Sequence, residues 1–153
     1  MKTPSTTSAN QKAIISEILV AIDGSDASMD AAEYAISISK EYNAELYALH
    51  VIRTDVELYG PHETSEYMTN MRDEGGKYLD KVEFKANEKN IQIKTVIIPS
   101  KNMSGDILDY AEENNIDLIV IGTRGRSGFK RLLLGSVASH VVTYAHCPVL
   151  VVK

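Results

Sequence analysis

A segment rich in glycine and basic residues runs from Gly122 to Ser136, "GTRGRSGFKRLLLGS", with four glycines, four basic residues and no acidic one. It overlaps the end of the apolar run "IDLIVIG", which has the length and composition of a buried strand. Glycine at Gly122 and Gly125 permits positive φ and lets main-chain N–H groups approach an anion closely. Gly135 and Ser136 then open a helix, whose first N–H groups have no intrahelical partner and favour negative charge. We predict that this segment binds a chain of phosphates.

A carboxylate stands at the corresponding point of the first strand, "EILVAID", which ends with Asp23. In an open parallel sheet, ligands bind beyond the carboxyl ends of the strands, where the strand order reverses. If the first strand is central and neighbours the fourth, Asp23 and Gly122 lie on either side of that crevice. Two structural readings stand beside this one: Asp23 and its neighbours as a turn with a helix cap, and the glycine-rich segment as a flexible connection.

The elements that must position these residues alternate along the chain. Strands are expected at residues 17–23, 44–52, 91–99, 116–122 and 148–152, and helices at about 25–43, 64–87, 104–115 and 136–146. We expect Ser25 or Asp26 to cap the first helix, Ser104 to open the third, and Pro99 to stop the third strand, whose alternating pattern suggests a sheet edge. The predicted fold class is α/β: one doubly wound, Rossmann-like, five-stranded parallel sheet of order 3-2-1-4-5 with helices on both faces. Residues 1–12 are expected to form a flexible extension, and residues 13–153 one domain.

The composition narrows the classes of protein. The chain has 153 residues and a formal net charge of −5, which argues against general nucleic-acid binding. No apolar stretch approaches the ~18 residues that cross a bilayer, so no membrane association is expected. The N-terminus lacks the pattern of a secretory signal, and the single cysteine, Cys147, fits a reducing compartment. A cytoplasmic location is the expectation.

The glycine spacing resembles that of a known family. Gly122-x2-Gly125-x9-Gly135-Ser136 matches the Gly-2x-Gly-9x-Gly-Ser/Thr motif of the ATP-binding branch of the universal stress protein family. "ILVAIDGSDAS", "LHVI" and "LLLGSVASHVVTYAHCPVLVV" are similar to further parts of that family. The resemblance implies that ATP binds, accompanied by Mg²⁺ or Mn²⁺. It also implies a role for each site residue. Asp23 contacts the nucleoside, Ala21 and Ile22 line the adenine slot, and Val51 binds adenine through its backbone. The phosphates are held by Gly122, Gly125, Gly135 and Ser136, and they are flanked by Ile121 and Val137.

The expected function is an ATP-binding regulatory protein of the stress response, a homodimeric sensor or switch with at most slow ATP hydrolysis. No G-x-x-x-x-G-K-[ST] loop is present, and we identify no catalytic residue. Two alternatives stay open: an enzyme that uses ATP, such as a nucleotidyl transferase or ATPase, and an interaction module in which the nucleotide is only structural. An enzyme needs a second pocket, for which the segment Arg53–Arg72 is the available material. The downstream protein partner is not identified by the sequence.

Four further residues or segments have expected roles. The C-terminal "PVLVVK" is β-rich and lies at a sheet edge on this topology, so we expect it to pair with a second copy across a two-fold axis. The alternative is that the N-terminal extension covers this edge. His50 is expected to be a buried, hydrogen-bonded histidine, His146 a cap at the C-terminus of the last helix, and Cys147 a small buried hydrophobe.

Overall fold

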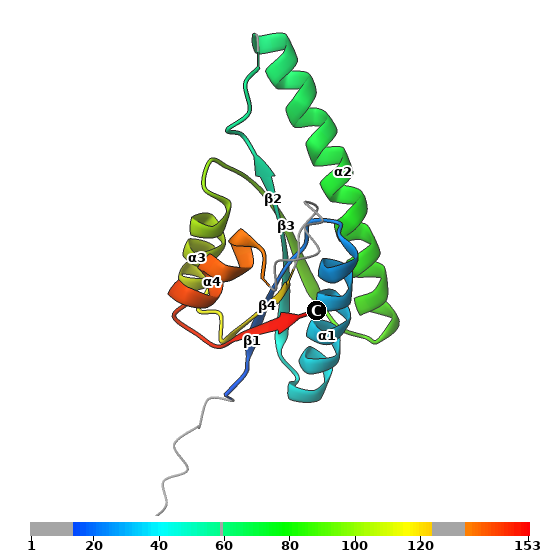
Figure 1. The fold of residues 1–153 in the computed structure, drawn as a ribbon. Helices are drawn as coiled ribbons and strands as arrows, with labels where there is room; N and C mark the ends of the chain where they lie inside the picture. Colours follow the sequence, from blue (N-terminus) through cyan, green and yellow to red (C-terminus); the bar gives the residue numbers. More distant parts are fainter. Residues whose placement is uncertain (1–13, 59, 124–133) are drawn as a thin grey trace, which may run out of the picture.

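Five parallel strands form a single sheet of order β3-β2-β1-β4-β5 (Figure 1). The structure, a computed structural model, describes residues 14–58, 60–123 and 134–153. The strands are β1 (Glu17–Ala21), β2 (Glu45–Arg53), β3 (Ile93–Ser100), β4 (Leu118–Gly122) and β5 (Val149–Val152). The predicted α/β architecture and strand order are confirmed. The order places β1 between β2 and β4. From β1 the chain adds β2 and β3 on one side of the sheet, and then crosses back to add β4 and β5 on the other side.

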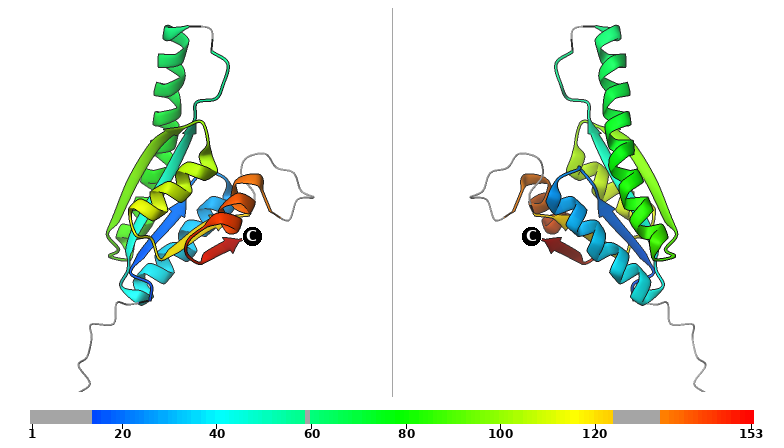
Figure 2. Two further views of the ribbon diagram at one scale, coloured as in Figure 1. Left: turned by 90° about the vertical axis from the view of Figure 1, so that its left-hand side faces the viewer. Right: turned by 90° about the vertical axis from the view of Figure 1, so that its right-hand side faces the viewer.

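Helices cover both faces of the sheet (Figure 2). One face packs against α1 (Asp26–Tyr42) and α2 (Pro61–Glu88), and the other against α3 (Met103–Glu113) and α4 (Ser136–Tyr144). Successive residues of β1 alternate between the two layers: Ile18 and Val20 belong to the first core, and Leu19 to the second. All three side chains are fully buried, as the solid apolar run predicts.

The outer half of α2 extends past the sheet (Figure 1). Its buried residues, Gly75, Leu79, Val82 and Ala86, all lie in the half nearer β3. The helix begins at Pro61, three residues before the predicted start, because proline is well suited to the first turn, where its missing N–H costs nothing. None of the described helices is both long and apolar enough to cross a membrane.

Two predicted boundaries around β3 are wrong. Pro99 lies within β3, opposite Ile52, and does not stop the strand. β3 is at the edge of the sheet, where a proline without an N–H is tolerated. The cap of α3 is Asn102, whose side chain accepts a hydrogen bond from the Gly105 N–H at 3.2 Å, and not Ser104. An asparagine is as good a cap as a serine, and it stands two residues earlier.

Candidate functional site

A cavity of about 330 Å³ opens beyond the carboxyl ends of β1 and β4. This is the predicted crevice, the point at which the strand order reverses. The predicted site residues that line it are Ala21, Ile22, Asp23, Val51, Ile121, Gly122, Gly135, Ser136 and Val137. The tenth, Gly125, lies outside the described residues, together with the four basic residues of its segment. The structure therefore brings together residues from four separate stretches of the chain.

The turn between β1 and α1 forms one wall of this cavity. Asp23 Oδ1 accepts a hydrogen bond from the Ser25 N–H at 2.9 Å, and Ser25 Oγ accepts one from the Ser28 N–H at 3.2 Å. Ser25 is thus the N-cap of α1, as predicted. Gly24 has φ of +85°, and a Cβ added there would overlap the ring of Tyr78 on α2. The turn-and-cap reading is confirmed, and the same turn presents Asp23 to the cavity.

The opposite wall begins at Gly122, the last residue of β4. Its role differs from the predicted one, because among the described glycines only Gly24 has a positive φ. A Cβ added at Gly122 would lie 2.8 Å from the carbonyl carbon of Ala27. Glycine is needed here because β4 ends against the first turn of α1, where no side chain fits. The prediction of positive φ at Gly122 is wrong.

The start of α4 completes that wall. The Gly135 N–H donates to the Thr123 carbonyl oxygen and is therefore used within the protein, whereas we expected it to face an anion. Gly135 is the N-cap residue of α4, and no side chain among the described residues caps this helix. The N–H groups of Ser136 and Val137 occupy the first positions of α4, where a helix supplies no acceptor. Both residues line the cavity.

Sequence reasoning missed eight residues of the cavity wall: Ser25, Ser28, Leu49, Arg53, Met103, Ile107, Thr123 and Ala138. Two signals could have found half of them. Side chains two apart on a strand share a face, so Val51 predicts Leu49 and Arg53 beside it on β2. Met103 and Ile107 are spaced i, i+4 on α3 and therefore share one side of that helix.

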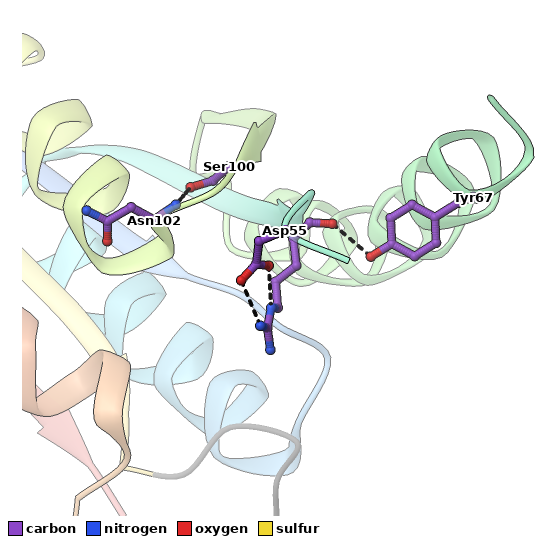
Figure 3. Close-up of polar contacts among 5 residues, drawn as sticks. Asp55, Tyr67, Ser100 and Asn102 are labelled. Carbon is purple, nitrogen blue, oxygen red and sulfur yellow. Dashed lines mark hydrogen bonds and ion pairs between the residues drawn. The ribbon is translucent and has the colours of Figure 1, made fainter. Parts of the chain in front are cut away.

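Arg53 is the charged residue of this set and stands at the end of β2. Its guanidinium donates two hydrogen bonds of 2.9 Å to the carboxylate of Asp55 (Figure 3). This hydrogen bonding holds the pKa of Asp55 below, and the pKa of Arg53 above, their ordinary values. The Arg53 carbonyl oxygen accepts from the Tyr67 hydroxyl at 2.8 Å, which ties the outer half of α2 to the end of β2 (Figure 3).

The two histidine predictions have different outcomes. His50 is buried, its Nδ1 lies 2.7 Å from the Ile22 carbonyl oxygen, and its ring packs against Gly75 of α2, so that prediction is confirmed. Since a carbonyl only accepts, Nδ1 carries the proton. The prediction for His146 is wrong: its Nε2 lies 3.1 Å from the carbonyl oxygen of Ile116, before β4, and not at the last turn of α4.

Cys147 is half-buried between α4 and β5. Burial raises the pKa of its thiol above the ordinary value. Because the thiolate is the nucleophilic form, this surrounding favours the unreactive thiol.

Fold and site together define a doubly wound α/β protein with a ligand-sized cavity at the switch point of its sheet. The model of the universal stress protein family matches residues 15–153, and the chain belongs to that family. It is 40% identical to the universal stress protein MJ0531 of Methanocaldococcus jannaschii over 94% of this chain and 85% of that protein. It is also 40% identical to YxiE of Bacillus subtilis, over 92% of this chain and all of that protein.

Solved structures agree with this fold. The universal stress protein UspA of Lactobacillus plantarum matches with a TM-score of 0.81 at 30% identity, over 90% of this chain and 97% of that one. A universal stress protein of Archaeoglobus fulgidus in complex with dAMP matches with a TM-score of 0.68 at 24% identity, over 92% and 99%. An Arabidopsis thaliana family member with AMP bound matches with a TM-score of 0.66 at 19% identity, over 90% and 91%.

Proposed function

We propose that this protein is an ATP-binding regulatory protein of the stress response, which binds ATP in the cavity beyond the carboxyl ends of β1 and β4. The observation that carries the proposal is the convergence of nine predicted site residues on that cavity. Its apolar part, from Leu49, Val51 and Ile107, suits a purine base, and Asp23 supplies a carboxylate for ribose hydroxyls. The start of α4, which no side chain in the described part of the chain caps, suits phosphate oxygens. Two structural neighbours hold adenine nucleotides, dAMP and AMP, which supports the same class of ligand.

Mg²⁺ or Mn²⁺ accompanies the nucleotide in this proposal. Such an ion binds phosphate oxygens and keeps several waters, so it needs few protein ligands. The chain would hold the nucleotide, and the ion would neutralise part of its phosphate charge.

Isothermal titration calorimetry of the full chain with ATP and Mg²⁺ tests the proposal. We expect saturable binding, and an increase in the free energy of unfolding of about 2.7 kcal/mol at 100 times the Kd. Asp23→Asn keeps the size of the side chain and removes its charge, and we expect it to weaken ATP binding about tenfold. The matched control is Asp30→Asn, at an exposed position of α1, which should bind as the unaltered protein does. Absence of binding at millimolar ATP would overturn the proposal.

Regulation rather than turnover is the second part of the proposal. Phosphate release from ATP should stay below about one turnover per second, at the low end of enzyme rates. Faster turnover would favour the alternative of an ATP-consuming enzyme. A protein that binds no nucleotide but retains a protein partner would favour the interaction module.

We further propose that the protein is a homodimer joined through β5. This strand ends the described sheet on one side, so its outer edge presents main-chain N–H and C=O groups to a partner strand. On α4, which packs against β5, Val142 and Tyr144 are 44% and 64% exposed. Exposed apolar side chains beside an open edge are typical of a surface that pairs with a second copy.

The hydrogen bonds of β5 allow a selective test. The carbonyl oxygens of Pro148 and Val152 accept hydrogen bonds from the N–H groups of Ile119 and Thr123, on the side of β4. Alternate residues of a parallel strand bond to the same neighbour, so Val151 directs its N–H to the outer edge. Val151→Pro removes that N–H and should give a monomer in analytical ultracentrifugation. Val151→Ala keeps the N–H and should stay dimeric; equal assembly of the two variants would refute pairing at this edge.

A further inference from the structure

A second hollow adjoins the nucleotide cavity. This groove, of about 400 Å³, lies between the ends of β2 and β3 and the first turns of α3 and α4. It shares Arg53, Met103, Ser136 and Val137 with the first cavity. Two hollows of similar volume with four residues in common form neighbouring lobes of one depression. A mononucleotide that fills the first lobe leaves the second to solvent.

The groove contains groups for each part of a nucleotide. Lys101 is exposed and, with Arg53, supplies positive charge for phosphate. The two bonds from Arg53 to Asp55 use two of the five N–H donors of the guanidinium and two of the roughly four acceptor positions of the carboxylate. Asp55 therefore keeps acceptor capacity for ribose hydroxyls, the chemistry proposed for Asp23 in the first lobe.

A base also finds a surface in the groove. The ring of His140 is exposed to it and lies 4.6 Å, centroid to centroid, from the ring of Tyr144. That contact restricts the imidazole and leaves a flat side chain at the edge of the lobe. Met103 and Val137 supply apolar walls between the two lobes. Apolar walls with a few placed polar groups are the composition expected of a small-molecule site.

We propose that the depression binds a dinucleotide, two nucleosides joined through phosphates, with one nucleoside in each lobe. The inference rests on the proposed nucleotide site and extends it. The linking phosphates lie against Ser136, which belongs to both lobes, and close to Arg53 and Lys101. The first nucleoside lies between Asp23 and Val51, and the second between Asp55 and His140. The groove thus makes the linked dinucleotide, and not a mononucleotide, the ligand that uses the whole site.

Calorimetry on the full chain with diadenosine tetraphosphate and with ATP, both with Mg²⁺, tests this inference. We expect the dinucleotide to bind at least tenfold more tightly than ATP. The groove variant is Lys101→Ala with His140→Ala. Its control is Lys81→Ala with His62→Ala, which removes the same two side-chain types from exposed positions on α2. The groove variant should lose the tenfold preference and keep its ATP affinity within twofold, and the control should keep both.

The outcomes separate the two proposals. If ATP binds but diadenosine tetraphosphate binds no more tightly, the second lobe is not a nucleoside site and the inference is wrong, while the ATP site stands. If the groove variant loses ATP and dinucleotide affinity equally, the lobes are not separate and the inference is also wrong. If neither nucleotide binds the unaltered protein, the proposed function fails and the inference falls with it.

Discussion

Of the helices that begin at the cavity, α1 and α4 begin differently. The first N–H groups of α1 are served by its own chain: Ser25 caps the helix, and Asp26 places a negative charge in the first turn. α4 follows the N-cap residue Gly135 and has no capping side chain among the described residues and no acidic residue in its first turn. Asn102 closes the start of α3 in the same way as Ser25 closes that of α1.

Under the proposed function, this difference separates a helix start that serves the fold from one that binds phosphate. A helix end that satisfies its own donors has little left for an anion, and its charge repels one. At the start of α4 no described side chain accepts from the first N–H groups, and a bound phosphate would offset the cost of leaving them without an acceptor. Within one cavity, the capped start of α1 positions the carboxylate of Asp23, and we propose that the start of α4 receives the negative charge of a ligand.

The largest expected effect comes from the contact between the two regions. Gly122→Val adds a branched side chain where even a Cβ would lie 2.8 Å from the Ala27 backbone. Backbone cannot move aside as a flexible side chain can, so we expect a loss of about 3 kcal/mol in the free energy of unfolding. Urea denaturation measures it. Gly76→Ala is the control: a Cβ there meets nothing within 4 Å, and alanine should stabilise α2 by about 0.5–1 kcal/mol. If Gly122→Val were as stable as the unaltered protein, β4 and α1 would not approach each other closely at Gly122.

A substitution that makes α4 resemble α1 should affect binding and folding in opposite directions. Gly135 has φ of −66° and ψ of 162°, which any residue adopts. Gly135→Asp supplies a cap and a negative charge, and should raise the free energy of unfolding by a few tenths of a kcal/mol. It should also weaken ATP binding tenfold or more, about 1.4 kcal/mol, because the carboxylate occupies the place of a phosphate and repels it. Thermal unfolding and calorimetry measure the two effects, and unchanged ATP affinity would show that the start of α4 does not bind phosphate.

The converse substitution removes the cap of α1 and has the smallest effect. Ser25→Ala leaves the Ser28 N–H without its acceptor and should lower the free energy of unfolding by about 1 kcal/mol. It also removes the hydrogen bond from the Ser25 hydroxyl to Asp23, which helps to hold that carboxylate in place. The Ser25 N–H still donates to Asp23, so ATP binding should weaken by less than it does in Gly135→Asp. Urea denaturation and calorimetry again provide both numbers. A variant as stable as the unaltered protein would mean that the cap of α1 is dispensable, and that the two helix starts are alike.

The sequence was sufficient for the architecture and for the position of the cavity. Continuous apolar runs alternate with segments whose apolar residues have helical spacing, and this pattern specifies a parallel sheet. The strand order then places Asp23, after β1, near Gly122, at the end of β4. The sequence was insufficient where a residue acts through a distant neighbour. The close approach of Gly122 to Ala27, and the bond from the Gly135 N–H to Thr123, depend on the distance between elements, which no spacing along the chain reveals. The groove beside Arg53 was missed for the same reason, since its walls come from β2, α3, α4 and the loops that follow β2 and β3.

The way α2 meets the rest of the molecule limits how this chain can vary in length. Gly75 accommodates the ring of His50, and Tyr78, one turn further on, covers Gly24, so the helix has a single axial position. One residue inserted between these two contacts would rotate everything beyond it by about 100°, and Tyr78 would no longer reach the turn that carries Asp23. Residues added before Tyr67 would lengthen only the outer end of α2, whereas residues added between Tyr67 and Gly75 would move the Tyr67 hydroxyl away from the Arg53 carbonyl oxygen. We therefore expect the outer end of α2, before Tyr67, to tolerate changes in length, whereas the three-residue step from Gly75 to Tyr78 cannot change without disturbing the turn that carries Asp23.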